Sequence, residues 1–152
     1  MTISTEFIFP IRPTARAVIW RDGKILAQVK QRGCGKPYLT LPGGKQEPGE
    51  SLADCVAREC AEEVGAPVEV GALLHLAEVF KPKEDGMRHQ VEALFACTIA
   101  KDYSPRLGPE PDASQIDTIW ACPVNDAAWF RPAYAPSLAD EAAPLYLGVL
   151  DG

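Results

Sequence analysis

The chain has 152 residues, of which 47% are hydrophobic and 24% are charged, and this is a usual size for one compact domain with its own core. Its formal net charge of −6 argues against a protein that grips a nucleic acid polymer by its phosphates, because that mode needs a basic face. This length predicts a single domain over residues 1–152. The five cysteines show neither CxxC nor Cys-His zinc spacing, so we expect them to be reduced core residues.

The N-terminal stretch MTISTEFIFPIRP predicts neither export nor membrane insertion. It has no basic start and no long apolar run, and no membrane-length apolar run occurs anywhere in the chain. We therefore expect a cytoplasmic protein without a membrane partner.

The segment that follows predicts a β-hairpin and a short strand. Apolar, β-branched runs at residues 15–20 and 24–30 are joined through Arg21-Asp22-Gly23, which is a hairpin signal. A short strand at residues 38–41 then leads into Pro42-Gly43-Gly44.

A helix is predicted next. Ser51 and Asp54 form a capping pattern at its start, and Gly65 ends it. Between these limits the apolar residues cluster on one arc beside the acidic one, which predicts a buried stripe next to a polar edge.

The second half of the chain predicts more strands and a short terminal helix. Strands are expected near residues 68–70, within 73–80, at 90–99 and at 118–124, with a long loop at 101–114. Ser137 with Asp140 suggests a second helix cap, followed by an apolar segment that Pro144 interrupts. Periodicity alone indicates an α+β or mixed α/β fold.

Three glutamates on the central helix form an acidic edge. At about 100° per residue, Glu59, Glu62 and Glu63 fall within one arc of roughly 100°. Each like-charged pair costs roughly 0.2 to 0.5 kcal/mol, and the macrodipole also disfavours anions in the last turns of a helix. A bound cation would reverse both penalties. Oxygen ligands without sulfur or imidazole suit Mg²⁺, with Mn²⁺ as the alternative.

A solvated helix face is the ordinary explanation of such an acidic run. Solvated helices tend to carry Lys or Arg four residues on, yet the residues four after Glu59 and Glu62 are Glu63 and Ala66. Arg58 is different, because it lies four residues before Glu62 and an ordinary surface ion pair explains it equally well.

The residues from Gly44 to Ala66 read GKQEPGESLADCVARECAEEVGA. This segment resembles the Nudix box of the Nudix hydrolases, GX5EX7REUXEEXGU, in which U is a bulky apolar residue. All the glycine and polar positions are present, whereas Cys60 and Ala66 are small at the two U positions. The resemblance implies an α/β fold, the Nudix α/β/α sandwich with a mixed β-sheet and a central loop-helix-loop catalytic motif.

The resemblance also implies roles for residues of the box. Glu59, Glu62 and Glu63 would supply metal ligands together with the backbone carbonyl of Gly44, while Glu50 and Arg58 would orient the ligands. Glu59 would accept the proton of the attacking water. Family members differ in this base, so the other acids that would substitute are Glu92, Glu84, Asp85, Glu110 and Asp112.

The substrate is less sharply indicated. Pro82, about sixteen residues beyond the box, matches a feature of some ADP-ribose pyrophosphatases. The side chains that would meet the substrate are Arg16, Arg32, Arg88 and Glu92, with Lys36 as a further cation and Trp20, Tyr38, Phe80 or Phe95 to stack on a base. A place in the core or on a solvated surface is the more usual explanation for each of them.

The sequence therefore predicts a Mg²⁺-dependent enzyme that cleaves a pyrophosphate bond in a nucleoside diphosphate derivative such as ADP-ribose or a nucleotide sugar. The alternatives are a housecleaning nucleoside triphosphate pyrophosphohydrolase and a non-catalytic nucleotide-sensing module of the same fold. Many members of the family are homodimers, and the apolar segment with Tyr146, Leu147, Val149 and Leu150 would serve either an interface or the core.

Overall fold

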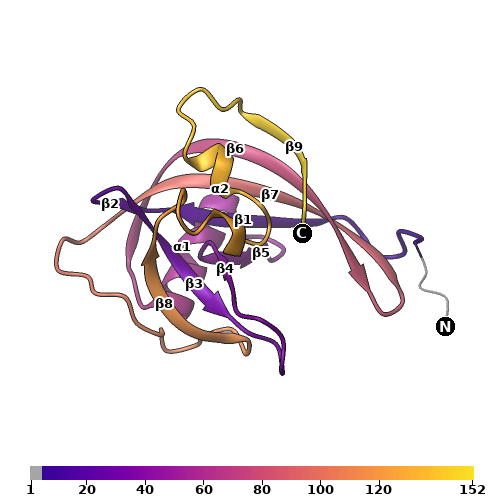
Figure 1. The fold of residues 1–152 in the computed structure, drawn as a ribbon, viewed down its shortest axis with the longest axis horizontal. Helices are drawn as coiled ribbons and strands as arrows, with labels where there is room; N and C mark the ends of the chain where they lie inside the picture. The colour runs from indigo at the N-terminus through magenta and orange to yellow at the C-terminus, as the bar shows by residue number, and fades with distance from the viewer. Residues whose placement is uncertain (1–4) are drawn as a thin grey trace.

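Two β-sheets and one long helix make up the fold of the computed structural model, which describes residues 5–152 (Figure 1). Residues 1–4, part of the stretch considered above for export, lie outside the described residues. The elements are β1 (Arg12–Val18), β2 (Trp20–Arg21), β3 (Lys24–Lys30), β4 (Tyr38–Thr40), β5 (Gly43–Lys45), α1 (Leu52–Val64), β6 (Val68–Lys83), β7 (Gly86–Ile99), β8 (Gln115–Ala121), the 3-10 turn η1 (Ala127–Trp129), α2 (Ala135–Leu138) and β9 (Tyr146–Leu150).

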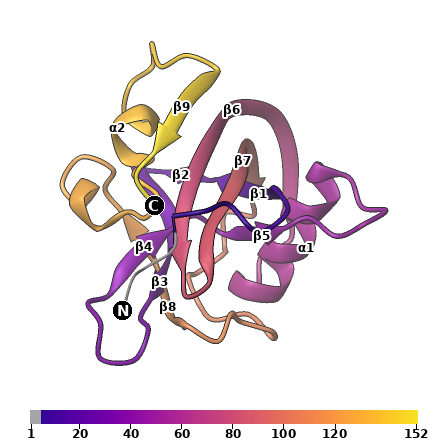
Figure 2. The same cartoon turned by 90° about the vertical axis from the view of Figure 1, so that its right-hand side faces the viewer.

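The larger sheet is mixed, as predicted. Its strand order is β5-β1-β7-β6-β9, with β1 parallel to β7 and β9 parallel to β6, and antiparallel pairing elsewhere. The smaller sheet has β3 at its centre, paired with β2, β4 and β8. Figure 2 shows α1 on one side of the strands and α2 on the other, which is an α/β/α sandwich whose second helical layer is one short turn.

Helix α1 forms where the sequence predicts it. The Ser51 hydroxyl accepts a hydrogen bond from the backbone N–H of Asp54 at 3.0 Å, and Gly65 ends the helix in the left-handed conformation at φ 65°. Its stripe of Val56, Cys60 and Val64 is fully buried against the larger sheet. Burial of each of these side chains contributes roughly 1 to 2 kcal/mol, so tertiary packing holds the helix in place.

Several strands differ from the predictions in their limits. The predicted strand at 15–20 is divided between β1 and β2, and only β2 forms the expected hairpin with β3, because β1 pairs with β5 and β7 in the larger sheet. The expected strands at 68–70 and 73–80 form one strand, β6, whose register shifts on either side of Leu73. Gly71 approaches the carbonyl of Ala96 closely, so it marks an irregularity in the ladder and not a chain break. Strand β8 ends at Ala121, because Pro123 cannot donate to a sheet ladder. Strand β5 pairs with β1 at residues for which no strand was predicted.

The C-terminal segment corrects the predicted second helix cap. Ser137 lies inside α2, whose N-cap residue is Tyr134, so it does not cap the helix. The apolar segment after Pro144 forms β9, in which Leu147 and Leu150 pack against the core. Tyr146 and Val149 remain more than half exposed, so only part of the segment closes the core. In the described part of the chain, no helix is long and apolar enough to cross a membrane.

At Gly43 the fold admits no side chain. Its φ is 147°, and a Cβ atom there would lie 2.8 Å from the Cα of Arg16 and closer still to the carbonyl of Ala15. We predict that Gly43→Ala lowers the free energy of unfolding by about 2 to 5 kcal/mol, the sum of backbone strain and overpacking. Gly49→Ala is the matched control, because Gly49 also has positive φ (85°) but no neighbouring atom within 4 Å. Urea denaturation measures both, and equal losses would contradict the predicted clash.

Candidate metal and phosphate site

The acidic edge of α1 meets strand β5 at two glycines. The Glu63 carboxylate, 4% exposed, accepts a hydrogen bond from the backbone N–H of Gly43 at 3.3 Å. The Glu59 carboxylate packs against Gly44 so closely that a Cβ atom there would lie 2.7 Å from its Oε1. A side chain at Gly44 would therefore displace Glu59, which explains a glycine at this position of the box.

Arg58 runs along the same edge and relieves part of its repulsion. Its guanidinium donates to Glu50 at 2.8 and 2.9 Å, to Glu59 at 3.1 Å and to Glu62 at 3.3 Å. Hydrogen bonding to Arg58 is the main cause that lowers the pKa of Glu50 to about 2. Arg58 thus makes the ordinary i,i+4 ion pair with Glu62 and also contacts the Glu59 carboxylate.

A cavity of about 260 Å³ opens in front of Glu59 and Glu63 and is strongly basic. Seven cationic side chains line it against three acids, although the chain as a whole carries a net charge of −6. The cations are Arg12, Arg16, Lys30, Arg32, Lys45, Lys81 and Lys83, and the acids are Glu59, Glu63 and Asp112. An acidic protein therefore concentrates positive charge at one place, where its own carboxylate cluster also lies.

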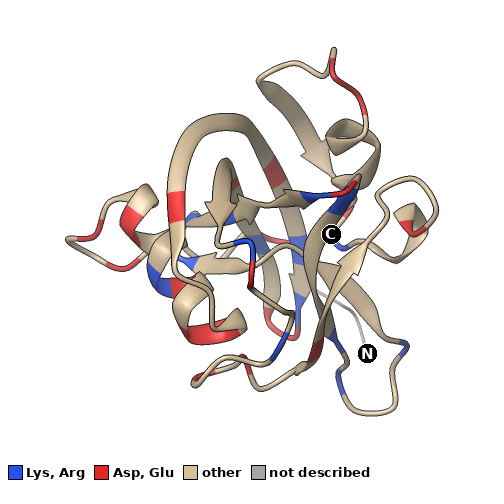
Figure 3. Ribbon diagram, turned by 90° about the vertical axis from the view of Figure 1, so that its left-hand side faces the viewer, with Lys and Arg blue, Asp and Glu red and all other residues tan. Residues whose placement is uncertain are grey.

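Strand alternation places these cations on one wall. Arg12 and Arg16 are four residues apart on β1, and Lys81 and Lys83 are two apart on β6, so each pair faces the same side of the larger sheet. Lys30 ends β3 and reaches the cavity from the smaller sheet. Figure 3 shows acidic segments in red on α1 and basic segments in blue on the neighbouring strands.

Arg16 is fixed by a buried ion pair. Its Nε lies 3.1 Å from Oε2 of Glu92, which is fully buried and also accepts a short hydrogen bond from the Thr14 hydroxyl. The guanidinium of Arg16 also donates to the backbone carbonyls of Leu41 and Gly43. Burial alone would lower the pKa of Arg16, but Glu92 outweighs it and raises that pKa, so Arg16 stays charged.

The remaining cations of the cavity are poorly compensated. Burial, followed by repulsion from Arg16, lowers the pKa of Lys81 to about 8, and burial also lowers the pKa values of Lys30 and Lys83. Within residues 5–152 the cations of this wall make only two ion pairs, Arg16 with Glu92 and Lys30 with Asp112 at 3.8 Å. The wall therefore has capacity for a bound anion.

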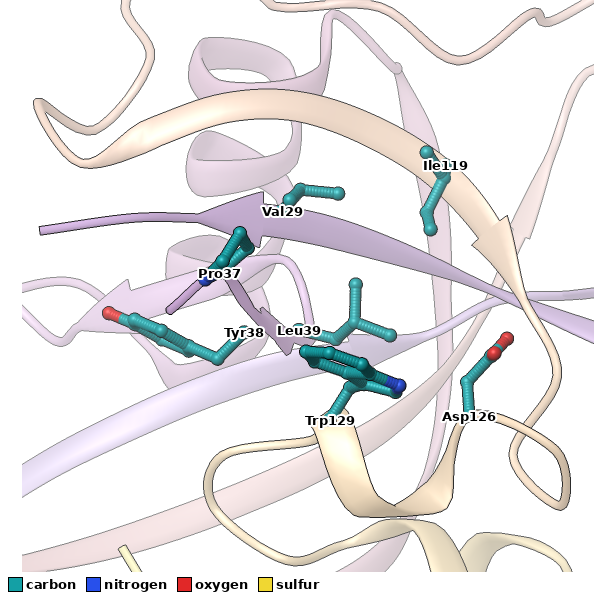
Figure 4. Close-up of a pocket in the computed structure, with 7 residues that line it drawn as sticks. All are labelled: Val29, Pro37, Tyr38, Leu39, Ile119, Asp126 and Trp129. Atoms are coloured by element: carbon teal, nitrogen blue, oxygen red, sulfur yellow. The ribbon is translucent and has the colours of Figure 1, made fainter. Parts of the chain in front are cut away.

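Two further hollows lie next to this cavity, and the second of them is an aromatic pocket. The first shares five of the cations and adds Tyr38, Thr40, Pro82 and Arg131. The next, of about 240 Å³, is mostly apolar, and Figure 4 shows Trp129 from η1 over Leu39, with Val29 and Ile119 from β3 and β8. Asp126 stands at the edge of this pocket, which we call the Trp129 pocket.

The structure brings only some of the sequence-predicted residues to the cavity. Gly44, Glu59, Glu63, Arg16, Arg32 and Asp112 line it. Glu50, Arg58 and Glu62 stand beside it, joined by the ion pairs of Arg58. Glu92 lies behind Arg16 without lining the cavity, and Arg88 stacks on Phe9 at 4.5 Å. The loop acids Glu84, Asp85 and Glu110 do not line it.

Sequence reasoning missed most of the basic wall and the Trp129 pocket. The missed cations are Arg12, Lys30, Lys45, Lys81 and Lys83. Lys81-Pro82-Lys83 was a usable signal, because alternate residues of a strand share one face. Of the aromatic candidates only Tyr38 lines these hollows, while Phe95 packs in the core and Phe80 stacks with Phe7.

The acidic edge has the ligand chemistry of a hard divalent cation. The available donors are carboxylate oxygens and the Gly44 carbonyl, which the Cys55 thiol approaches at 3.5 Å. Among the described residues no three Asp, Glu, His or Cys side chains converge on one point, and Arg58 makes ion pairs with both Glu59 and Glu62. An ion at this edge would therefore displace contacts of Arg58.

Residues 10–145 match the model of the NUDIX domain family. The chain belongs to this family. A relative described as an ADP-ribose pyrophosphatase, from Methanocaldococcus jannaschii, is 33% identical over 78 residues. That match covers 51% of the present chain and 45% of the relative, so it spans about half the length of each.

Solved structures confirm the NUDIX fold. A MutT NUDIX hydrolase from Burkholderia pseudomallei is 28% identical, with a TM-score of 0.62 over 76% of this chain and 86% of that one. A NUDIX hydrolase from Nitrosomonas europaea is 22% identical and superposes with a TM-score of 0.66, covering 99% of this chain and 83% of that one. The predicted family and sandwich fold are thereby confirmed.

The buried pair of this NUDIX protein yields a stability prediction. Arg16→Met leaves the Glu92 carboxylate buried without its cation and should cost about 3 to 5 kcal/mol in the free energy of unfolding. Arg16→Met combined with Glu92→Leu should recover much of that loss, because no charge is then left unpaired. Urea denaturation of the two single variants and the double variant measures the coupling. Additive losses would contradict a buried, mutually dependent pair.

Glu63 makes stability depend on pH. Burial first and Glu59 second raise its pKa from 4.5 to about 7, so the folded state binds this proton more tightly than the unfolded state. This contribution to stability is fully present below pH 4.5 and is lost as the pH rises through 7. Between pH 5 and 8 this group should lower the free energy of unfolding of the wild-type protein by on the order of 1 to 3 kcal/mol. We predict that this decrease is absent in Glu63→Gln.

Denaturation midpoints with divalent ions removed measure this pH dependence. Glu141→Gln is the matched control, because Glu141 is exposed and lines none of the hollows described above. An unchanged pH profile in Glu63→Gln would contradict the assignment.

Proposed function

We propose that this NUDIX protein uses Mg²⁺, with Mn²⁺ as a substitute, to hydrolyse a pyrophosphate bond in a nucleoside diphosphate derivative. The observation that carries this proposal is the meeting of two opposite charge clusters in one cavity, carboxylates on α1 and cations on the sheet wall. A metal-bound polyphosphate is the ligand that satisfies both at once, because its ion neutralises the acids and its oxygens neutralise the cations. The NUDIX membership and the pyrophosphatase relative support the same reaction.

The chemistry needs charge neutralisation and a positioned water. Glu59, Glu62, Glu63 and the Gly44 carbonyl would hold the metal, which when bound neutralises phosphate charge and lowers the pKa of water. Glu50 holds Arg58 and thereby sets where the carboxylates of Glu59 and Glu62 lie.

Residues of the basic wall would bind the phosphates. Arg16, kept in place by Glu92, and Lys81 donate to phosphate oxygens on the side opposite the carboxylates. Glu59 accepts the proton of the attacking water in this proposal. Asp112 is the alternative base among the loop acids, because it lines the cavity.

The Trp129 pocket would take the nucleobase. Trp129 offers an indole that is 50% exposed, and Leu39 and Ile119 supply an apolar wall. One carboxylate oxygen of Asp126 already accepts from the backbone N–H of Cys122 at 2.8 Å, which leaves the other to accept from an amino group of a base. Tyr38 lines both this pocket and the adjoining basic hollow, so a nucleotide would span the two.

Residues 1–152 would form one domain, since the family model covers residues 10–145. ADP-ribose is one candidate substrate, because the Methanocaldococcus jannaschii relative is described as an ADP-ribose pyrophosphatase. Pro82, the feature shared with some ADP-ribose pyrophosphatases, lines the adjoining basic hollow. A nucleoside triphosphate is the second candidate, favoured by the excess of cations over acids in the cavity. The cytoplasmic location and the homodimer remain predictions.

The reaction is tested with a nucleotide panel in the presence of Mg²⁺, with products separated chromatographically. We predict that Glu59→Gln lowers kcat/KM by at least the roughly 10- to 100-fold that follows loss of a metal-supporting residue. Exposed Glu141→Gln should keep wild-type activity. Cleavage that survives chelation of metals and the Glu59 change would contradict the proposal, and tight nucleotide binding without any turnover would favour the nucleotide-sensing module.

A further inference from the structure

We propose that Tyr134 is a positioning residue for phosphate binding, because its hydroxyl holds Glu92 and through Glu92 directs Arg16 at an anion in the cavity. Tyr134 is the N-cap residue of α2 and does not line the cavity. This inference rests on the part of the proposed function in which Arg16 binds phosphate. It gives a role in binding to a residue of the second helical layer that would not itself touch the substrate.

The larger sheet places Tyr134 next to a buried polar layer. Thr14 and Arg16 of β1 pair with Glu92 and Leu94 of β7. Alternate residues of a strand share a face, so these four side chains lie on one side of the sheet. On that side Leu94 belongs to the core cluster that also contains Tyr134. Tyr134 therefore stands where the apolar core under α2 meets the buried ion pair of Arg16 with Glu92.

Two buried polar atoms in this region lack partners. Glu92 uses only its Oε2, which accepts from Nε of Arg16 at 3.1 Å and from the Thr14 hydroxyl. In the part of the chain that the structure describes, neither Oε1 of Glu92 nor the hydroxyl of Tyr134 has a hydrogen-bond partner. Both residues are fully buried, and unpaired polar groups are unfavourable there. One of these atoms is an acceptor and the other belongs to a donor.

The Tyr134 hydroxyl is the donor that suits Oε1 of Glu92. Burial raises the pKa of Tyr134, Glu92 raises it further and Arg16 lowers it, so both charges act on a hydroxyl that keeps its proton. An ionised carboxylate can only accept hydrogen bonds, whereas a protonated hydroxyl can donate one. A small shift of the Glu92 carboxyl or the Tyr134 ring would therefore pair the two groups.

The orientation of Arg16 depends on Glu92. The guanidinium uses Nε for Glu92 and Nη1 for the backbone carbonyls of Leu41 and Gly43. Among the residues that the structure describes, its Nη2 has no hydrogen-bond partner, so this nitrogen is left for an anion in the cavity that Arg16 lines. A bound phosphate attracts the guanidinium away from Glu92. A carboxylate held at Oε1 by Tyr134 resists that movement and keeps Nη2 directed at the phosphate.

Calorimetric binding of α,β-methylene ATP, whose α–β bridge resists hydrolysis, measures this role in the presence of Mg²⁺. We expect Tyr134→Phe to weaken binding of the analogue at least about fivefold, the effect of a lost hydrogen bond to a charged group. The thermal midpoint of this variant without the analogue should be unchanged or raised, because the substitution removes a buried hydroxyl that has no partner among the described residues.

Tyr103→Phe is the matched control. Tyr103 is also buried, but its hydroxyl donates to the backbone carbonyl of Val64 at 2.7 Å. Loss of this bond should lower the thermal midpoint by roughly 2 to 4 °C and change the affinity for the analogue less than about twofold. The two tyrosine variants should therefore differ in opposite ways, one in affinity and the other in stability.

A second background shows whether Tyr134 acts through Arg16. Arg16→Lys keeps the positive charge but lacks the planar fork that joins Glu92 to the cavity. In this background, once its thermal midpoint shows that it folds, Tyr134→Phe should change the affinity for the analogue less than about twofold.

The outcomes distinguish the positioning role from the proposed reaction. If Tyr134→Phe binds the analogue as tightly as the wild type, or weakens it equally in Arg16→Lys, the positioning role is refuted even when hydrolysis proceeds. A lower thermal midpoint with unchanged affinity would refute it in the same way, because Tyr134 would then be structural only. If the affinity falls and the fall requires Arg16, the role stands even when the nucleotide panel shows no hydrolysis, which would refute only the proposed reaction.

Discussion

Electrostatic opposition across one cavity is the constraint on which the rest of this structure depends. Carboxylates crowd one edge of α1, and seven cations crowd the facing wall, yet few of these charges pair with each other. Such an arrangement lowers stability unless something else holds the groups in place. Two devices do so here: the close approach of β5 to α1 at Gly43 and Gly44, and the buried pair of Arg16 with Glu92. The unpaired charges of this cavity thus lower the stability of the fold locally, and they are the groups that would bind a ligand.

Much of the fold follows from local sequence signals. The limits of α1 follow from Ser51 and Gly65, because capping chemistry is local, and β3 appears at its predicted residues. The C-terminal segment could not be placed in the same way. Strand β9 depends on pairing with β6, about seventy residues earlier, and no local pattern shows this partner. Gly71 illustrates the same limit, since an irregularity inside a long strand and a break between two strands have one sequence signature.

The same distinction applies to the site, because one part of it lies within a single segment and the other part is assembled from distant strands. The acidic edge and its glycines lie within one short segment, so the helical period brings them together before any tertiary structure is known. The basic wall draws on β1, β3, β5 and β6, which only the sheet order brings together. Glu92 shows the cost of missing that information, because a residue considered for the substrate proves to be the buried support of Arg16. The position of Trp129 could not be predicted from the sequence either, since it lies beside Tyr38 and Leu39 but comes from a turn about ninety residues later.

Coupling between metal and polyphosphate is the most direct measure of whether the two charge clusters act on one ligand. Calorimetric titration of Mg²⁺ into the protein, with and without saturating α,β-methylene ATP, gives that coupling once Mg²⁺ binding by the free nucleotide, measured in a separate titration, is subtracted. We predict that the nucleotide strengthens Mg²⁺ binding at least about tenfold, and that Glu59→Gln abolishes the gain. Equal Mg²⁺ affinity in the two titrations, or a gain that survives Glu59→Gln, would contradict a shared site.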